Sequence, residues 1–221
     1  GDVYKRQQPC RWKYNLVEEH RPGQYMEIGE TPDNGSYILN ANDLCTAPFI
    51  DLICKAGVDS LKIEGRAKTF YYVASVVSAY RRALDTFLAD PYNDNFELPD
   101  AVIEELNRTS HRHYSPGFYF GKEQAQQTPS HTYVRDWDFI GTVESWENGI
   151  AHCTQRGKFT AGDSIEILQP DGSVIPLAPA WIENADGERV DATPHPMMQY
   201  TIPCEAPLMP YSLIRMQKKA E

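Results

Sequence analysis

No apolar run in these 221 residues approaches the length of a membrane span, so the sequence excludes a transmembrane helix. Residues 1–8 are polar and show no apolar core of a signal peptide. Positive charge is also in deficit, because 31 acidic residues against 21 basic residues give a net charge of −10. This balance argues against a protein that coats nucleic acid through bulk attraction, although it allows a local basic groove.

Cysteine is scarce and irregularly spaced. The five cysteines are odd in number and do not form the pattern of a disulfide framework, which favours a reducing, cytoplasmic location. Three hydrolase signatures are also missing, namely His-Glu-x-x-His, Gly-x-Ser-x-Gly and a convincing Cys/His pair. These residues therefore offer no visible catalytic group for hydrolysis.

The residues that could carry chemistry concentrate in one stretch, 60–66, with the sequence Ser-Leu-Lys-Ile-Glu-Gly-Arg. Apolar and charged side chains alternate, which predicts a strand over 58–65 with Lys62 and Glu64 on one face. A helix follows, and ligands are usually held at the carboxyl end of the strand in such a βα unit. We therefore predict a site at this edge formed by Lys62, Glu64 and Arg66.

Each of these three residues also has a structural interpretation. Glu64 and Arg66 are predicted to be an active-site acid and a guanidinium clamp for a substrate carboxylate, with a structural salt bridge as the alternative. Lys62 could hold a substrate phosphate or pair with Glu64, and pairing is favoured.

Helices are predicted over residues 46–57, 67–88 and 99–107 from capping residues and from the helical spacing of apolar side chains. In the long second helix, the apolar positions that define the amphipathic pattern are Phe70, Val73, Ala74, Val77, Leu84 and Leu88.

The pattern changes after a polar linker at residues 121–131. Short strands are predicted at 139–146, 150–155, 164–168, 173–177 and 211–216, with Asn-Gly and Asp-Gly turns that are typical of hairpins. The fold class is therefore α/β plus all-β. We predict an α/β piece at 1–88, a helical connector and linker at 89–131, and an antiparallel β domain at 132–221.

Several of these segments resemble the U32, or collagenase-like, peptidase family, and most of all its branch of tRNA hydroxylation proteins. The segments that carry the resemblance are 10–14, 40–45, 56–66 and 110–118. The resemblance implies the C-terminal part of a TIM-barrel-like α/β domain, followed by a small β-barrel similar to domain 2 of translation factors. Family members carry further residues before the first motif, and a cysteine is expected at the position of Arg6. The chain is therefore predicted to be an N-terminally truncated fragment.

The resemblance also implies an iron–sulfur cluster of the four-iron type in the intact protein, with Cys10 and Cys45 as ligands. Two thiolates cannot complete such a cluster, so none is expected in these residues alone. Without the resemblance, both cysteines would be interpreted as buried apolar residues. We assign Cys54, Cys153 and Cys204 to packing.

An aromatic and basic group near the N-terminus is a candidate for RNA contact. Arg11, Trp12 and Tyr14 could stack on and clamp a nucleobase, and a tryptophan buried under a loop is an equally good interpretation. His111 and His113 flank an arginine and could form an acid/base or RNA-contacting cluster. Exposed or capping loop residues are the favoured interpretation of these two histidines.

Three functions follow from these observations. The first is iron–sulfur-dependent hydroxylation of a tRNA uridine to 5-hydroxyuridine, with Arg66 anchoring a carboxylate hydroxyl source such as prephenate. The second is the peptide hydrolysis of the family name. The third is a non-catalytic RNA- or protein-binding β module, because a truncated α/β domain exposes sheet edges and is predicted to be inactive by itself.

Overall fold

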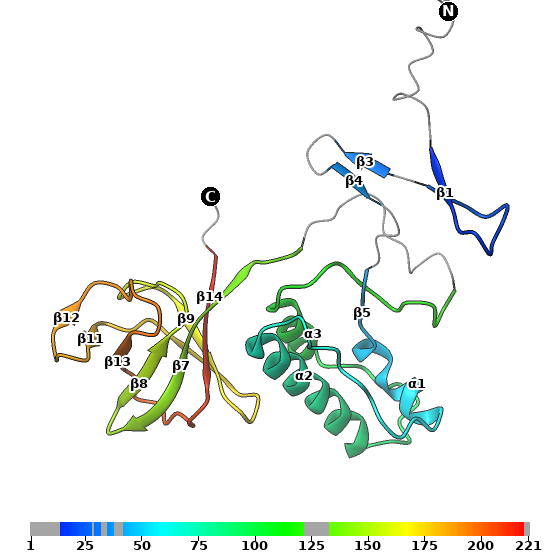
Figure 1. Ribbon diagram of the computed structural model, residues 1–221. Coiled ribbons are helices and arrows are strands. Elements are labelled where there is room, and N and C mark those ends of the chain that lie inside the picture. The colour runs from blue at the N-terminus through cyan, green and yellow to red at the C-terminus, as the bar shows by residue number, and fades with distance from the viewer. Residues whose placement is uncertain (1–13, 28, 32–34, 38–41, 122–132, 219–221) are drawn as a thin grey trace, which may run out of the picture. The chain divides into compact units, whose positions relative to one another are not determined.

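The structure is a computed structural model that describes residues 14–27, 29–31, 35–37, 42–121 and 133–218 (Figure 1). The chain divides into two compact units, which are described separately. The first comprises residues 1–45 and 112–133, and the second comprises residues 46–111 and 134–221. Among the described residues, no helix has the length and apolarity of a membrane span.

Three two-stranded pairings lie in the described part of the first unit. β1 (Asn15–Val17) and β2 (Tyr25–Glu27) form an antiparallel hairpin, and β3 (Gly29–Thr31) pairs with β4 (Gly35–Tyr37) in the same sense. β5 (Asp43–Leu44) runs parallel to β6 (Tyr114–Ser115). This pairing brings together two motifs that lie about 70 residues apart in the sequence.

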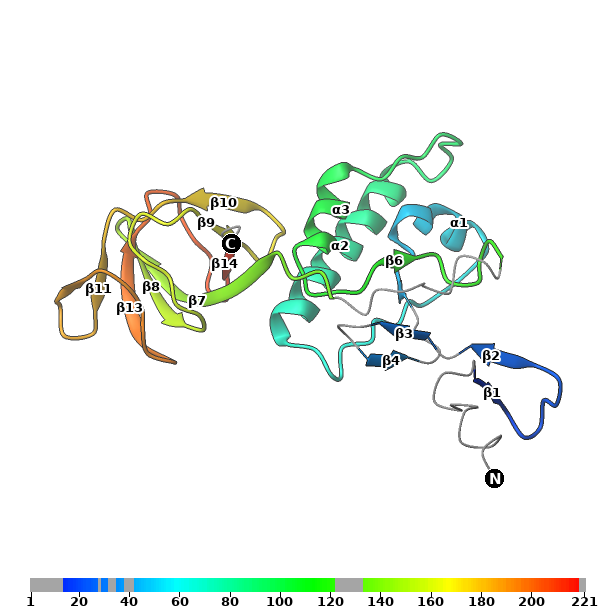
Figure 2. The same cartoon turned by 90° about the horizontal axis from the view of Figure 1, so that it is seen from above.

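The helices of the second unit lie where the sequence predicts them. A 3₁₀ turn η3 (Ala47–Phe49) leads into α1 (Ile50–Lys55), and Gly57 follows with a positive φ of 81°. α2 (Phe70–Ala89) begins at Thr69, whose side chain accepts a hydrogen bond from the Tyr72 amide. α3 (Asp100–Asn107) lies beside α2 (Figures 1 and 2).

The buried face of α2 is not the one that the apolar pattern predicts. The side chains that the structure buries are Val76 and one i, i+4 row, namely Tyr71, Ser75, Ala79, Ala83 and Phe87. Phe70, Val73, Val77 and Leu88 are 50, 36, 46 and 57% exposed. The small side chains of the buried row allow neighbouring elements to approach the helix axis closely, which large side chains would prevent.

An eight-stranded antiparallel sheet makes up the rest of the second unit (Figure 2). Its order is β10-β9-β14-β7-β8-β13-β11-β12. The strands are β7 (Trp137–Glu147), β8 (Ile150–Gln155), β9 (Ile165–Leu168), β10 (Val174–Leu177), β11 (Ile182–Asn184), β12 (Arg189–Val190), β13 (Gln199–Pro203) and β14 (Leu213–Gln217). Pairing runs from β10 to β12 without closing on itself among the described residues. The fold is therefore a mixed α/β structure with a large antiparallel sheet.

The five strands predicted in this region are all present, and the sheet contains three more that the sequence analysis missed, β11, β12 and β13. Asn148 and Gly149 have φ angles of 50° and 83°, as expected for the predicted hairpin turn between β7 and β8. The core of the sheet contains Cys153 and Cys204, which are 1 and 2% exposed, so their assignment to packing is confirmed.

The strand predicted over 58–65 is wrong, because these residues have no regular secondary structure. The side-chain alternation behind the prediction is nevertheless present. Leu61 and Ile63 are half-buried, whereas Lys62 and Glu64 are exposed. A strand requires a hydrogen-bonded neighbour, and this segment pairs with no strand in the described part of the chain.

Candidate functional site

The predicted acid and guanidinium contact one another in the loop before α2. One oxygen of Glu64 accepts a 2.8 Å hydrogen bond from the backbone amide of Arg66, and the other lies 3.5 Å from the Arg66 guanidinium. The Arg66 amide, followed by its side chain, lowers the pKa of Glu64, and the charge of Lys62 acts in the same direction. The Glu64 carboxylate is therefore ionised at neutral pH.

This ion pair is open to solvent. The side chains of Arg66 and Glu64 are 89 and 59% exposed, and Lys62 is exposed beside them. An exposed pair contributes little to stability, so a ligand can replace one partner at small cost. A guanidinium in this position can bind a carboxylate or phosphate through two parallel hydrogen bonds.

Helix α2, which follows this loop, is held in place at its first turn. The ring of Tyr71, in the first turn of α2, stacks on Phe139 of β7 with centroids 5.2 Å apart, and Phe70 meets the same ring edge-on at 5.0 Å. The Tyr71 hydroxyl also donates a 3.0 Å hydrogen bond to the backbone carbonyl of Arg108, which follows α3. The loop of residues 62–66 thus precedes a helix end that is held on two sides.

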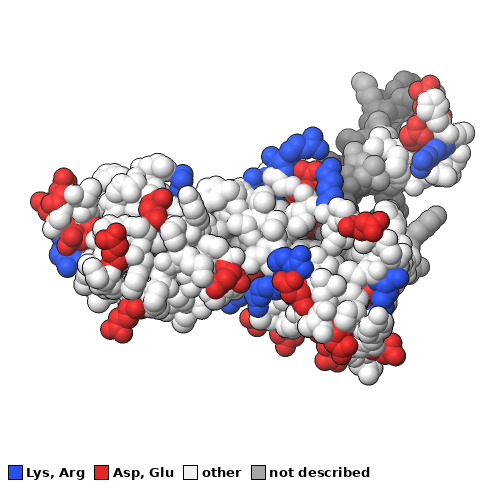
Figure 3. Space-filling view, turned by 90° about the horizontal axis from the view of Figure 1, so that it is seen from below, with Lys and Arg blue, Asp and Glu red and all other residues white. Residues whose placement is uncertain are grey.

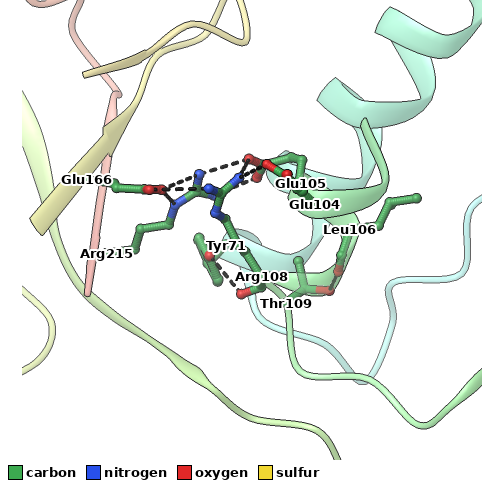
Figure 4. Close-up of polar contacts among 8 residues, drawn as sticks. All are labelled: Tyr71, Glu104, Glu105, Leu106, Arg108, Thr109, Glu166 and Arg215. Carbon is green, nitrogen blue, oxygen red and sulfur yellow. Dashed lines mark hydrogen bonds and ion pairs between the residues drawn. The ribbon is translucent and has the colours of Figure 1, made fainter. Parts of the chain in front are cut away.

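A buried network of charges joins α3 to the sheet (Figure 4). Arg215 of β14 donates two hydrogen bonds of 2.6 and 2.8 Å to the carboxylate of Glu105, and both side chains are almost completely buried. Glu166 of β9 accepts from Arg215 at 3.0 Å and from Arg108 at 3.2 Å. Burial acts to lower the pKa of Arg215, but the hydrogen bonds and charge of Glu105 outweigh burial and raise it.

The sequence pattern did not predict this network, although one signal was available. Arg215 is the only charged residue in the segment Leu213–Met216, which otherwise reads as a buried strand. Because Arg215 and Glu105 at its centre are buried and hydrogen-bonded to one another, we interpret the network as a structural element rather than as a binding site.

Two apolar grooves border the outer face of α2. The larger, of about 810 Å³, lies between α2 and the sheet, and Phe70, Val77 and Leu213 are among its walls. The smaller, of about 350 Å³, lies between α2 and the segment 58–63. Val77 and Arg81 line both grooves, so the helix forms a ridge between them.

Hydrogen bonds hold the segment around Cys45 in the first unit. The backbone amide of Cys45 donates to the Ser115 carbonyl at 3.0 Å, and the cysteine is 6% exposed. Asp43 accepts two 3.0 Å hydrogen bonds from Arg112, one from its backbone amide and one from its guanidinium. Cys45 belongs to the first unit and Glu64 to the second.

The described residues do not fit the ligand set of a four-iron cluster. Such a cluster takes four thiolates, and Cys10 lies outside the described residues. No group of three or more His, Cys, Asp and Glu side chains that could hold a metal occurs within the described part of the chain. A cluster would therefore need ligands beyond these residues.

The remaining predicted site residues fall into two groups. Arg11 and Trp12 lie outside the described residues, whereas Tyr14 is described and is 52% exposed. His113 is exposed as expected, but His111 is 5% exposed, and its backbone exchanges hydrogen bonds of 3.3 and 2.8 Å with Val134. The interpretation of His111 as an exposed loop residue is therefore wrong, because this bridge draws it inward.

Charge on the surface is mixed. On the face shown in Figure 3, Lys and Arg side chains occur in small groups next to Asp and Glu side chains. This distribution agrees with the net charge of −10.

Comparison with known proteins identifies the family. The profile of peptidase family U32 matches residues 5–129, and that of the peptidase family U32 C-terminal domain matches residues 135–215. The chain is 30% identical over 215 residues to tRNA hydroxylation protein P1 of Bacillus subtilis, covering 96% of this chain and 50% of that protein.

Two further relatives carry different names. Over 186 residues the chain is 34% identical to tRNA hydroxylation protein P of Escherichia coli, covering 82% of this chain and 39% of that protein. Over 175 residues it is 29% identical to a collagenase of Porphyromonas gingivalis, covering 76% and 40%. The chain thus spans about half or less of the length of these relatives. Its two matched regions together show that the chain belongs to peptidase family U32.

Proposed function

We propose that the intact gene product acts in tRNA modification, as a protein that helps to hydroxylate a tRNA uridine to 5-hydroxyuridine. The observation that carries this proposal is the similarity to a protein named for tRNA hydroxylation over 96% of the chain. That similarity includes the loop with Lys62, Glu64 and Arg66, whose charged groups are exposed and can reach a large substrate.

The roles of the individual residues belong to the same proposal. Arg66 would anchor a carboxylate hydroxyl source, such as prephenate, and Glu64 would hold the Arg66 guanidinium in position until this ligand replaces it. Lys62 adds a second positive charge on the same face. Arg11, Trp12 and Tyr14 would contact a base of the tRNA, for which the exposed ring of Tyr14 is suitable.

An iron–sulfur cluster would supply the redox chemistry in the intact protein. Cys10 and Cys45 are the proposed ligands from these residues, with others supplied from elsewhere in the polypeptide. We also propose that residues 1–88 complete a TIM-barrel-like domain in the intact protein, and that residues 132–221 correspond to domain 2 of translation factors, with 89–131 connecting them.

Peptide hydrolysis is the second candidate, favoured by the name of the Porphyromonas gingivalis relative. It needs an activated nucleophile or a metal-bound water. Burial raises the pKa of the thiols of Cys54, Cys153 and Cys204, which opposes activation of these cysteines. These three thiols are therefore poor nucleophiles, and the similarity to proteins named for tRNA hydroxylation favours tRNA modification over hydrolysis. A non-catalytic binding role for the sheet is the third candidate.

Mass spectrometry of tRNA nucleosides tests the proposal. A strain that lacks the gene should lose 5-hydroxyuridine derivatives, and the wild-type gene should restore them. Glu64→Gln and Arg66→Gln should fail to restore them, whereas Arg189→Gln should succeed, because Arg189 makes an exposed pair with Glu183 in the sheet. Unchanged nucleosides in the deletion strain would refute the proposal, and cleavage of gelatin by the purified protein would then favour hydrolysis.

A further inference from the structure

The larger groove of the second unit has the size of a small-molecule site. Its volume is about 810 Å³, and ligand pockets usually measure about 300–1,000 Å³. Helix α2 contributes Val73 to its lining, and the sheet contributes Leu168 and Leu213. The two walls are in contact beside it, because a Cβ at Gly172, in the turn after β9, would lie 2.9 Å from the Arg82 side chain of α2. The groove therefore has firmly placed walls and an apolar lining that suits a flat ring.

Each wall of this groove carries one exposed aromatic ring. Phe70, in the first turn of α2, is 50% exposed, and Tyr211, in the loop before β14, is 80% exposed. The backbone of Tyr211 has a φ of 69°, an outlier for a bulky residue because the Cβ crowds the following carbonyl oxygen. Hydrogen bonds hold this conformation, since the Tyr211 amide donates to the Val143 carbonyl at 2.8 Å and the Ser212 hydroxyl donates to the Met209 carbonyl at 2.7 Å. A backbone outlier that presents a large exposed ring indicates that the ring has a function.

The charged side chains that line this groove are basic. Although acidic residues outnumber basic residues by 31 to 21 in the chain, the groove is lined by Lys68 and Arg81 and, among the described residues, by no acidic side chain. A third cation lies beside it, since the guanidinium of Arg156 is 5.5 Å from the centroid of the Phe70 ring. Arg81 pairs with Asp85 at 2.6 Å, but both side chains are more than half exposed, so an anionic ligand can replace this partner at small cost. The groove thus fits a ligand that combines a flat ring with a negative charge.

We propose that this groove binds a nucleotide of the RNA substrate. In sites for single-stranded RNA, aromatic side chains stack on the bases and basic side chains contact the phosphates. Here Tyr211 and Phe70 pack against the base, and Lys68 and Arg81 contact the neighbouring phosphate. Lys68 is two residues from Arg66, which places their Cα atoms no more than about 7 Å apart, so the bound nucleotide lies beside the predicted site loop. The inference rests on the proposed function, because tRNA is the partner proposed there.

Binding of fluorescently labelled tRNA to the intact gene product tests the ring of Tyr211. Tyr211→Ala should weaken binding about tenfold through the loss of one stacked base, whereas Tyr211→Phe should stay within about twofold of the wild type. Tyr211→Gly should weaken binding as much as Tyr211→Ala without lowering the urea midpoint, since glycine adopts a positive φ readily. The matched control is Tyr92→Ala, which removes a 93% exposed tyrosine outside the groove and should bind as the wild type does. Wild-type affinity of both Tyr211→Ala and Tyr211→Gly would overturn the proposal.

The salt dependence of the same binding tests the two cations. Lys68→Gln and Arg81→Gln should each reduce the slope of log Kd against log salt concentration by about one. Arg189→Gln should leave the slope unchanged, because Arg189 pairs with Glu183 in the sheet, away from the groove. Unchanged slopes for both Lys68→Gln and Arg81→Gln would overturn the proposal.

Uridine monophosphate identifies the source of the nucleotide. It should compete with tRNA only weakly, because one nucleotide makes a small share of the contacts of an RNA, and binding as tight as that of tRNA would show a free-nucleotide site and overturn the proposal. These experiments measure binding and not modification. Weaker binding by Tyr211→Ala therefore supports the groove even if a strain that lacks the gene keeps its 5-hydroxyuridine derivatives, in which case the proposed function alone fails.

Discussion

Replacing Arg215 by methionine should destabilise the protein strongly, because it leaves a buried carboxylate without its counter-charge. Arg215 is 0% exposed and Glu105 is 1% exposed, and they are joined by two hydrogen bonds of 2.6 and 2.8 Å. Breaking a buried ion pair by removing one partner costs about 3–5 kcal/mol. Arg108 remains 3.9 Å from the same carboxylate, which places the expected loss near the lower end of this range.

The chain offers a matched control for this variant. Arg81 also pairs with a carboxylate at 2.6 Å, that of Asp85, but both side chains are more than half exposed. Arg81→Met should therefore change the free energy of unfolding by no more than about 1 kcal/mol. The two variants remove the same group from ion pairs of equal length, one buried and one exposed, and Arg215→Met also removes the hydrogen bond to Glu166.

Urea unfolding followed by circular dichroism measures both variants. Replacing both partners, as in Glu105→Leu with Arg215→Met, should recover much of the lost stability, because no buried charge is then left uncompensated. Equal stabilities for Arg215→Met and Arg81→Met would refute the reasoning, and so would a double variant that is less stable than Arg215→Met alone.

Three other predictions concern single side chains. Burial raises the pKa of the Cys153 thiol, so the thiol stays protonated in the folded state at a pH above about 8.5, where the unfolded chain loses this proton. The free energy of unfolding should therefore be at its full value below that pH and should fall by about 2 kcal/mol between pH 8.5 and 10, with a shallower fall in Cys153→Ala. Gly141→Ala should cost about 1–3 kcal/mol in urea unfolding, because the new Cβ would lie 2.6 Å from the buried Tyr200 hydroxyl. Glu64→Gln should leave the urea midpoint unchanged while lowering tRNA modification, since Glu64 is exposed, and a shifted midpoint would show a structural role instead.

Local signals were sufficient to predict most of the helices and strands. The spacing of apolar side chains indicated α2, Pro99 marked the start of α3, and the Asn148-Gly149 turn indicated the β7–β8 hairpin. The strands β11 to β13 were missed because two of them have only two or three residues, too few for an alternation to be visible. Their positions depend on pairing rather than on local sequence, because β13 pairs with β8, β11 pairs with β13, and β12 pairs with β11.

The buried face of α2 was mistaken because hydrophobic pattern and packing select different residues. A pattern read from sequence gives weight to Phe70, Val73 and Val77, which are large and apolar. The buried row instead contains Ser75 and Ala79, whose small size permits close packing. Similarly, no local signal connects Arg215 with Glu105, since they are 110 residues apart. Only the isolated charge in an apolar strand indicates that Arg215 has a buried partner.

The location of the charged loop explains how an exposed ion pair can be held well enough to serve as the proposed binding site. Residues that bind ligands are often found in loops that a rigid scaffold positions. Here the loop of residues 62–66 leads directly into α2, whose first turn is fixed to β7 through Tyr71 and Phe139. The Arg215–Glu105 pair fixes α3 to the same sheet. The charged groups of the loop are therefore exposed, whereas the helix that follows the loop is fixed to the sheet through the buried ring of Tyr71.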